Sequence, residues 1–237
     1  MGGLSSQETT NRPVTFPGES AQYRAARDKL LQSEIALRRQ IEAVAAERRA
    51  LPPGGPITQD YVFERTGTDG APQAVRMSEL FGDSPTLVLY SFMYGPDRKT
   101  PCPGCTHFLD GMDGASLHIV QRVPFYVVAR SPLSRLEALA RDRGWQHLNF
   151  LADSEGAYTH DYLARNENGD QPMLNTFQRA NHEEGGVIRH FWGSEMMYAP
   201  TEPGQHIRHN DLMDPVWNLF DVTPEGRGDF FPKLSYP

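Results

Sequence analysis

Two cysteines, Cys102 and Cys105, are the only thiols in this sequence, and two residues separate them. A C-x-x-C pair can act as a dithiol, in which one sulfur attacks a disulfide and the second sulfur releases the product. An apolar run from Thr86 to Tyr94 precedes the pair, and residues 106–120 can form a helix. Strand, loop, C-x-x-C and helix in this order are typical of a redox site, and we expect Cys102 to attack and Cys105 to resolve.

The predicted helix supplies the reason for this division of roles. A helix N-terminus carries partial positive charge, which stabilises a thiolate at its first residue. Pro103 suits a first helical turn, where its missing N–H costs nothing. Arg98 and Lys99 add positive charge nearby. We therefore expect the Cys102 thiol to have a lowered pKa.

Other interpretations of the pair remain open. The two cysteines could provide half of a zinc site, although His107 and His118 would then have to complete it with an unusual spacing. They could also be two unrelated buried residues. We expect no metal and no other cofactor, and a surface or structural role for most of the histidines.

Composition narrows the class of protein. The chain has 237 residues and a net charge of −7, which argues against nucleic acid and anionic membranes as partners. No apolar run approaches the ~20 residues of a membrane-spanning helix. The N-terminal residues lack the pattern of a secretory signal, and two cysteines are too few for a disulfide framework. We expect a cytoplasmic protein.

A long helix is predicted from about Ser20 to Leu51, before Pro52 and Pro53. It would be roughly 45–50 Å long, at ~1.5 Å per residue. It could lie on its own domain or reach a second subunit, and we expect a homodimer. Its apolar side chains recur every seven residues at Tyr23, Leu30, Leu37, Val44 and Leu51.

From residue 57 the pattern changes to alternating strands and helices. Strands are predicted at 61–65, 86–93, 123–129 and 148–151, with a hairpin formed by 173–179 and 187–192. Helices are predicted at 106–120, 133–143 and 210–220. This order predicts a thioredoxin-like α/β fold, in its peroxiredoxin-like variant, with a long N-terminal helix. We divide the chain into an arm and helix (1–55), the α/β domain (56–222) and a C-terminal tail (223–237).

Several segments also resemble a bacterial family of unknown function described as predicted thioredoxin-like dithiol–disulfide oxidoreductases. The resemblance implies the same fold and dithiol chemistry, and this chain departs from it at residues 165–171 and 199–204. The segments that carry it are 60–64, 90–96, 102–105 with 108–111, 144–145, and, most specifically, 218–227.

Two further resemblances concern the site. Peroxiredoxins place Pro, Thr and Cys at fixed spacing, and Pro96 and Thr100 match that spacing while Cys102 comes one residue early. Thioredoxins place a cis-proline opposite the C-x-x-C, and Pro172 occupies the corresponding position before a predicted strand. A trans proline at a strand start is the alternative there. His107, two residues after Cys105, is the one histidine with a possible supporting role.

These observations predict a thiol–disulfide oxidoreductase that acts on a disulfide- or thiol-containing substrate and is regenerated by a reductant that the sequence does not identify. A thiol peroxidase of the peroxiredoxin type is the first alternative. A non-enzymatic metal-binding or interaction module that uses Cys102, Cys105 and His107 is the second.

Overall fold

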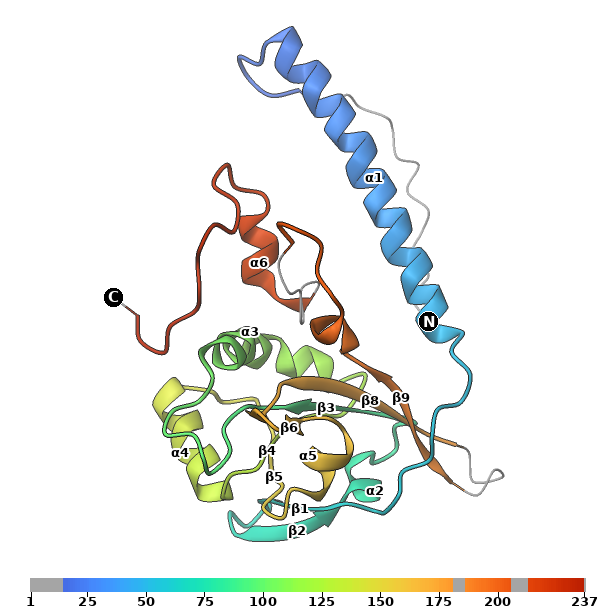
Figure 1. Cartoon of the computed structure of the whole chain (residues 1–237), viewed down its shortest axis with the longest axis vertical. Coiled ribbons are helices and arrows are strands. Elements are labelled where there is room, and N and C mark those ends of the chain that lie inside the picture. The colour runs from blue at the N-terminus through green and yellow to red at the C-terminus, as the bar shows by residue number, and fades with distance from the viewer. Residues whose placement is uncertain (1–14, 181–185, 206–212, 237) are drawn as a thin grey trace. The chain divides into compact units, whose positions relative to one another are not determined.

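The computed structural model describes residues 15–180, 186–205 and 213–236. The chain falls into two compact units, residues 1–51 and residues 52–237 (Figure 1). A search of the described residues finds no helix that is both long and apolar enough to cross a membrane.

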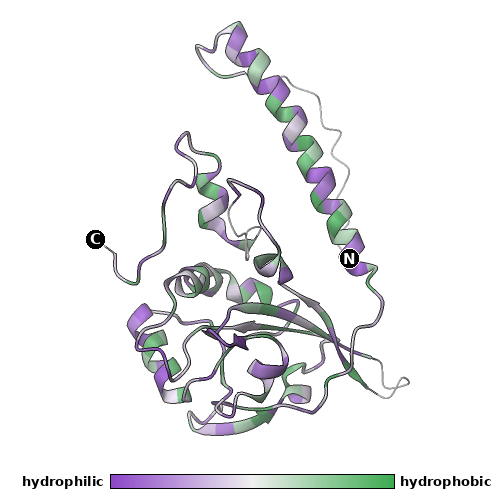
Figure 2. Cartoon of the chain, in the orientation of Figure 1, coloured by the Kyte–Doolittle hydropathy of each residue, from purple (hydrophilic) through white to green (hydrophobic). Residues whose placement is uncertain are grey.

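The first unit contains one long helix, α1 (Ala21–Arg49). Its N-cap is Ser20, whose hydroxyl oxygen accepts a hydrogen bond of 3.1 Å from the backbone N–H of Tyr23. The helix stops just before Pro52 and Pro53, as predicted. None of its residues is buried, and apolar and polar residues alternate along it (Figure 2).

The second unit is built on a seven-stranded sheet with the strand order β2-β1-β5-β4-β3-β8-β9. The pairs β3–β4 and β4–β5 are parallel, and the other neighbours are antiparallel. The strands of the sheet are β1 (Val62–Thr66), β2 (Pro72–Arg76), β3 (Thr86–Ser91), β4 (Phe125–Ala129), β5 (Phe150–Ala152), β8 (Met173–Arg179) and β9 (Ile188–Gly193).

Helices cover both faces of this sheet (Figure 1). The remaining elements are α2 (Met77–Leu80), α3 (Pro103–Ile119), α4 (Leu133–Arg143), α5 (Ala157–Asp161), the hairpin β6 (Arg165–Asn166) and β7 (Gly169–Asp170), the short 3-10 helix η2 (Glu195–Tyr198), and α6 (Pro215–Phe220). The order β3-α3-β4-α4, followed by the hairpin β8-β9 and then α6, is the thioredoxin-like order expected from the sequence.

Side-chain alternation in β3 divides the core into two layers. Tyr90 and Phe92 pack with Phe108 of α3 and Leu136 of α4 on one face. Leu87 and Leu89 lie on the other face in a cluster that contains residues of α2 and α5. Because β3 lies inside the sheet and is covered on both faces, its sequence is apolar throughout. The chain that leaves its carboxyl end carries both cysteines.

Most of the predicted elements are present, and their boundaries differ for physical reasons. The strand expected from residue 148 begins at Phe150, because Asp113 Oδ1 accepts hydrogen bonds from the N–H groups of residues 146–148. The helix expected over 210–220 begins at Pro215, after its N-cap Asp214, and residues 210–212 lie outside the described part. The turn expected at 181–186 lies largely outside it. The predicted helix 133–143 is correct, and Gly144 ends it with a φ of 76°.

Candidate functional site

The loop after β3 places Cys102 immediately before the first residue of α3. Its backbone N–H donates to the Met93 carbonyl oxygen at 3.1 Å, which ties the residue to the end of the strand. Its carbonyl oxygen accepts from the backbone N–H and the hydroxyl of Thr106, both at 2.9 Å. Cys102 is therefore the helix N-cap, in extended conformation, with Pro103 at the first helical position.

The Cys102 sulfur lies in surroundings that favour the thiolate. Its pKa is lowered from 9.0 to about 6, first by a hydrogen bond from the Cys105 thiol and then by the backbone N–H groups of Cys105 and Gly104. These N–H groups face the sulfur without closing a full capping hydrogen bond. The Arg98 guanidinium lowers the pKa further. Cys102 is partly exposed.

Cys105 has the opposite character, although it lies only one turn away. It is buried, and burial raises the pKa of its thiol well above the ordinary value. The hydrogen bond between the Cys105 thiol and Cys102 raises this pKa further. Hydrogen bonds from the Tyr90 hydroxyl and the Met93 N–H lower it. Both cysteines are free thiols in the structure. The site therefore pairs a partly exposed thiolate with a buried, protonated thiol.

Tyr90 is a site residue that sequence analysis did not identify. It lies on β3 facing α3, is fully buried, and its ring centre lies 4.8 Å from that of Phe108. Burial and the nearby sulfurs raise the pKa of its hydroxyl, so Tyr90 stays protonated. The available signal was strand alternation, which places residue 90 on the same face as the helix that carries the cysteines.

A buried carboxylate holds the start of the loop between β3 and Cys102. Asp170 accepts a hydrogen bond from the Gly95 N–H at 2.8 Å and another from Arg130 Nε at 3.1 Å. A Cβ at position 95 would lie 2.2 Å from Asp170 Oδ2, so only glycine fits there. This contact joins the β6–β7 hairpin to the loop, and spacing alone could not have shown it.

Arg135 of α4 holds the middle of the same loop. Its guanidinium donates to the carbonyl oxygens of Gly95 at 3.0 Å and of Arg98. Lys99, which was predicted to support the thiolate, is exposed, and its carbonyl oxygen lies 3.4 Å from Arg135. The contacts of Arg135 therefore fix the path of the loop so that the Arg98 guanidinium can act on Cys102.

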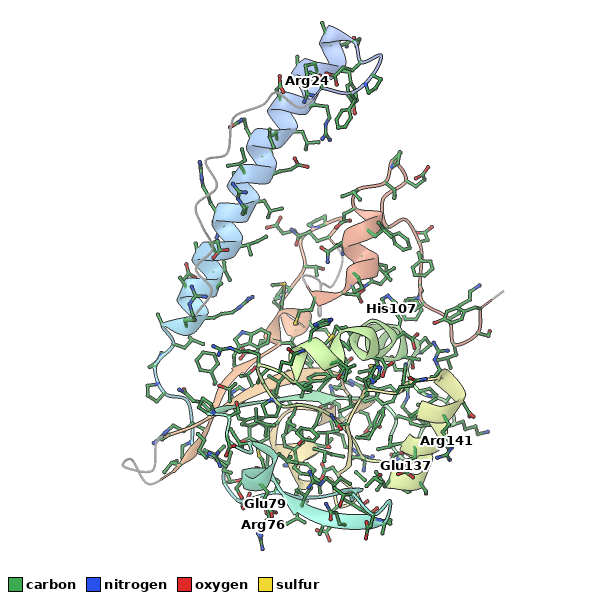
Figure 3. All side chains as sticks on the ribbon, turned by 180° about the vertical axis from the view of Figure 1, so that it is seen from behind. Arg24, Arg76, Glu79, His107, Glu137 and Arg141 are labelled. Carbon is green, nitrogen blue, oxygen red and sulfur yellow. The ribbon has the colours of Figure 1, made fainter. Side chains whose placement is uncertain are left out.

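His107 lies on α3 but is not grouped with the sulfurs. Its Nε2 lies 3.4 Å from Oδ1 of the buried Asp214, and its ring meets Trp217 edge-on at 5.6 Å, on the side facing α6 (Figure 3). His118 is in the last turn of α3. A search of the described residues finds no group of three or more His, Cys, Asp or Glu residues placed to hold a metal ion. Cys102, Cys105 and His107 therefore form no such site.

The sequence left the isomer of the peptide bond before Pro172 open, and the described residues contain no cis peptide bond. The Gln171 N–H donates to the Ala164 carbonyl oxygen at 2.8 Å, and β8 starts at Met173. The chain thus enters the strand in an extended path that needs no cis turn. The alternative interpretation, a trans proline at a strand start, is correct.

Comparison with known proteins gives one sequence match and several structural ones. A family described as "Bacterial protein of unknown function (DUF899)" matches residues 13–235. No curated protein matches the chain.

The solved structures that are similar to this chain include three redox proteins. AhpC of Enterococcus faecalis is 16% identical with a TM-score of 0.42, covering 65% of this chain and 83% of its own. The mitochondrial 2-Cys peroxiredoxin of Plasmodium falciparum is 10% identical with a TM-score of 0.43, covering 73% and 95%. The exposed lipoprotein thioredoxin of Streptococcus pneumoniae is 18% identical with a TM-score of 0.35, covering 62% and 91%.

Proposed function

This chain belongs to the bacterial family of unknown function that matches residues 13–235, and we propose that it is a thiol–disulfide oxidoreductase. The observation that supports this proposal is the pairing of two unlike thiols. Cys102 has a pKa near 6 and is partly exposed, whereas the buried Cys105 stays protonated beside it.

In the first step the Cys102 thiolate attacks one sulfur of a substrate disulfide. A bond forms between Cys102 Sγ and that sulfur, the substrate S–S bond breaks, and the other sulfur leaves as a thiolate that takes a proton from water. The helix N-terminus keeps Cys102 ionised near neutral pH, when an ordinary cysteine is largely protonated. The product is a mixed disulfide between Cys102 and the substrate.

In the second step Cys105 loses its proton and attacks Cys102 Sγ. The mixed disulfide breaks, the second substrate thiol leaves, and a Cys102–Cys105 disulfide forms. The substrate has then gained two electrons and two protons. The protein has supplied both electrons and the Cys105 proton, and water has supplied the other proton. A thiol reductant returns the protein to the dithiol state. Formation of the mixed disulfide removes the charge on Cys102, which eases ionisation of its buried neighbour.

The test is to trap the mixed disulfide. In a lysate of the source bacterium, Cys105→Ser should accumulate mixed disulfides between Cys102 and its partner proteins. These should appear as bands that disappear after reduction, and mass spectrometry should identify the partners. Cys102→Ser is the matched control and should trap none. Equal trapping by both variants, or preferential labelling of Cys105 in the unmodified protein, would overturn the assignment of roles.

A thiol peroxidase is the second candidate, because a partly exposed thiolate with a neighbouring thiol also suits attack on a peroxide. The Cys102 thiolate would attack one peroxide oxygen and become a sulfenic acid. The O–O bond breaks, and the other oxygen leaves as an alcohol or water after taking a proton from the solvent. Cys105 would then close the disulfide with loss of water. Turnover of hydrogen peroxide and of a small disulfide should be measured with the same reductant. Faster turnover of peroxide would favour this candidate over the exchange reaction.

A further inference from the structure

A cleft of about 380 Å³ lies on the sheet face opposite α3, and neither cysteine lines it. One wall is the segment 54–58, which runs along the outer strand β9. The His190 N–H donates to the Gly55 carbonyl oxygen at 3.0 Å, and the Ile57 N–H to that of Ile188 at 3.0 Å. A Cβ at Gly54 would lie 2.0 Å from the His190 oxygen, so this approach requires glycine. The wall is therefore fixed by backbone contacts.

The floor of the cleft is a polar pair on β8 and β9. His190 Nε2 lies 3.0 Å from Asn175 Oδ1, and Asn175 Nδ2 lies 3.2 Å from the hydroxyl of the buried Tyr158. Gly193, opposite Asn175, makes room for this pair, because a Cβ there would lie 3.0 Å from Asn175 Oδ1. Burial lowers the pKa of His190, so the ring is neutral at pH 7 and adds no positive charge to the floor.

The opposite wall is apolar and strained. The Tyr162 ring stacks on His190 with centres 5.6 Å apart and an interplanar angle of 28°. Leu163 follows with a φ of 57°, the only positive value at a described residue other than glycine, and the residue is 62% exposed. A leucine in this conformation costs free energy, and such strain is concentrated at binding sites. Met173 adds a further apolar surface.

Negative charge lies at two places on the lining. Asp161 Oδ2 accepts hydrogen bonds from the Tyr61 hydroxyl at 2.6 Å and from Thr58 Oγ1 at 3.1 Å, and the Tyr61 bond lowers the pKa of Asp161. Glu195, at the start of η2, is exposed. The described lining includes no lysine or arginine. The cleft therefore combines an aromatic and aliphatic wall with two carboxylates.

We propose that this cleft binds a small organic cation, an ammonium group carried on an apolar body. The ammonium group is held by Asp161 and Glu195, and the apolar body lies against Tyr162, Leu163 and Met173. A cation near the face of an aromatic ring gains further attraction. An anionic ligand of the same shape is repelled. This site is separate from the dithiol and does not depend on the proposed exchange reaction.

The test uses phenethylamine, which is cationic at neutral pH, with phenylacetate and 2-phenylethanol as anionic and neutral controls. Each is titrated into the reduced full chain at pH 7, and nitrogen NMR of the histidine rings follows His190. Phenethylamine should bind saturably with a Kd below about 1 mM and shift the His190 signals. The two controls should bind at least several-fold more weakly.

The double variant Asp161→Asn, Glu195→Gln should weaken phenethylamine binding about tenfold, since each exposed ion pair contributes up to about 1 kcal/mol. Asp69→Asn, a neutralised carboxylate in an exposed turn, should leave the affinity unchanged. Gly193→Ala should reduce binding while the labelling rate of Cys102 stays normal, which shows that the fold is kept. Absence of saturable binding, equal binding of 2-phenylethanol, or an unaltered affinity in the double variant would each overturn the proposal.

Discussion

The guanidinium carbon of Arg135 lies 3.8 Å from the centre of the Tyr94 ring. In this position the side chain donates to the Gly95 and Arg98 carbonyl oxygens and to Ser131 Oγ. Ser131 Oγ in turn donates to the Tyr94 carbonyl oxygen at 2.6 Å. A residue of α4 thus fixes the path of the loop that ends at Cys102, although it is not close to either sulfur in sequence.

Arg135→Lys should raise the pKa of Cys102 and slow its alkylation at pH 6. Lysine keeps the charge but cannot donate in a planar fork to several carbonyl oxygens, so Arg98 loses its fixed position. We expect a loss of about 1–2 kcal/mol in loop stability, because each hydrogen bond from a charged group contributes that order. The pH–rate profile of iodoacetamide labelling measures the effect. Arg141→Lys, on an exposed position of the same helix, is the control and should leave the profile unchanged.

The reactivity of Cys102 should depend on pH with a midpoint near 6. Only the thiolate reacts, so the labelling rate should rise between about pH 5 and 7 and be level above that. Since the folded pKa lies below the ordinary value of 9.0, the thiolate stabilises the reduced fold fully above pH 9. That stabilisation is lost as the pH falls through 6. Denaturant unfolding of the reduced protein and of Cys102→Ser should show a difference that grows from pH 5 to 9, and a midpoint above 8 for labelling would contradict the site geometry.

Tyr90→Phe should slow the second step of exchange more than the first. The Tyr90 hydroxyl lowers the pKa of Cys105, so its removal makes the resolving thiol harder to ionise. One hydrogen bond of about 0.5–1.5 kcal/mol corresponds to a two- to tenfold slower resolution. Stopped-flow quenching with a fluorescent disulfide should show more mixed disulfide on Cys102 than in the unmodified protein. Phe92→Leu, a change in the same core cluster just after β3, is the control. An equal accumulation of mixed disulfide in this variant would show that any loosening of the core slows the second step.

The sequence was informative where local rules decide the structure. The C-x-x-C spacing and Pro103 placed Cys102 at a helix start, and Ser20 with Pro52 gave the limits of α1 to within two residues. These signals act over a few residues, so tertiary contacts do not change them. The central strand β3 was visible because both of its faces are buried.

The parts that the sequence did not show depend on long-range contacts. The hydrogen bond between Gly95 and Asp170 joins residues 75 positions apart in the sequence, and the one between Arg135 and Arg98 joins residues 37 positions apart. Neither pair forms a periodic pattern. Strands of two residues, such as β6 and β7, are too short to carry one. The isomer at Pro172 stayed open because the resemblance to thioredoxins gives only a position, while the isomer depends on the local path of the chain.

Asp113→Ala should destabilise the protein by about 1–3 kcal/mol. Its Oδ1 accepts the backbone N–H groups of Gln146, His147 and Leu148 at 3.0, 2.8 and 3.2 Å, and alanine leaves these donors without the carboxylate. Asp113→Asn keeps an acceptor oxygen and should retain part of the lost stability. Chemical denaturation at pH 7 measures both variants. Equal stability of Asp113→Ala and the unmodified protein would show that water replaces these bonds at no cost.

We predict that α1 mediates a homodimer. Its apolar positions repeat every seven residues, and all of them except the half-buried Val44 are exposed, with Leu37 60% and Tyr23 49% accessible. A continuous apolar stripe of this length is rarely left in water by a soluble monomer. Ala36 and Ala43 leave room for another helix to approach closely. The seven-residue period is the one that packs two helices side by side along a shared seam.

Sedimentation at micromolar concentration tests this prediction on the full chain. A dimer should have twice the chain mass of 26.6 kDa. The double variant Leu30→Glu, Leu37→Glu should sediment as a monomer, because charges placed on both sides of a packed apolar seam repel each other and lose solvation. Arg39→Glu lies on an exposed position of the same helix, outside the stripe, and should leave the dimer intact. A monomeric mass for the unmodified chain, or a dimer that survives deletion of residues 1–51, would contradict the role of α1.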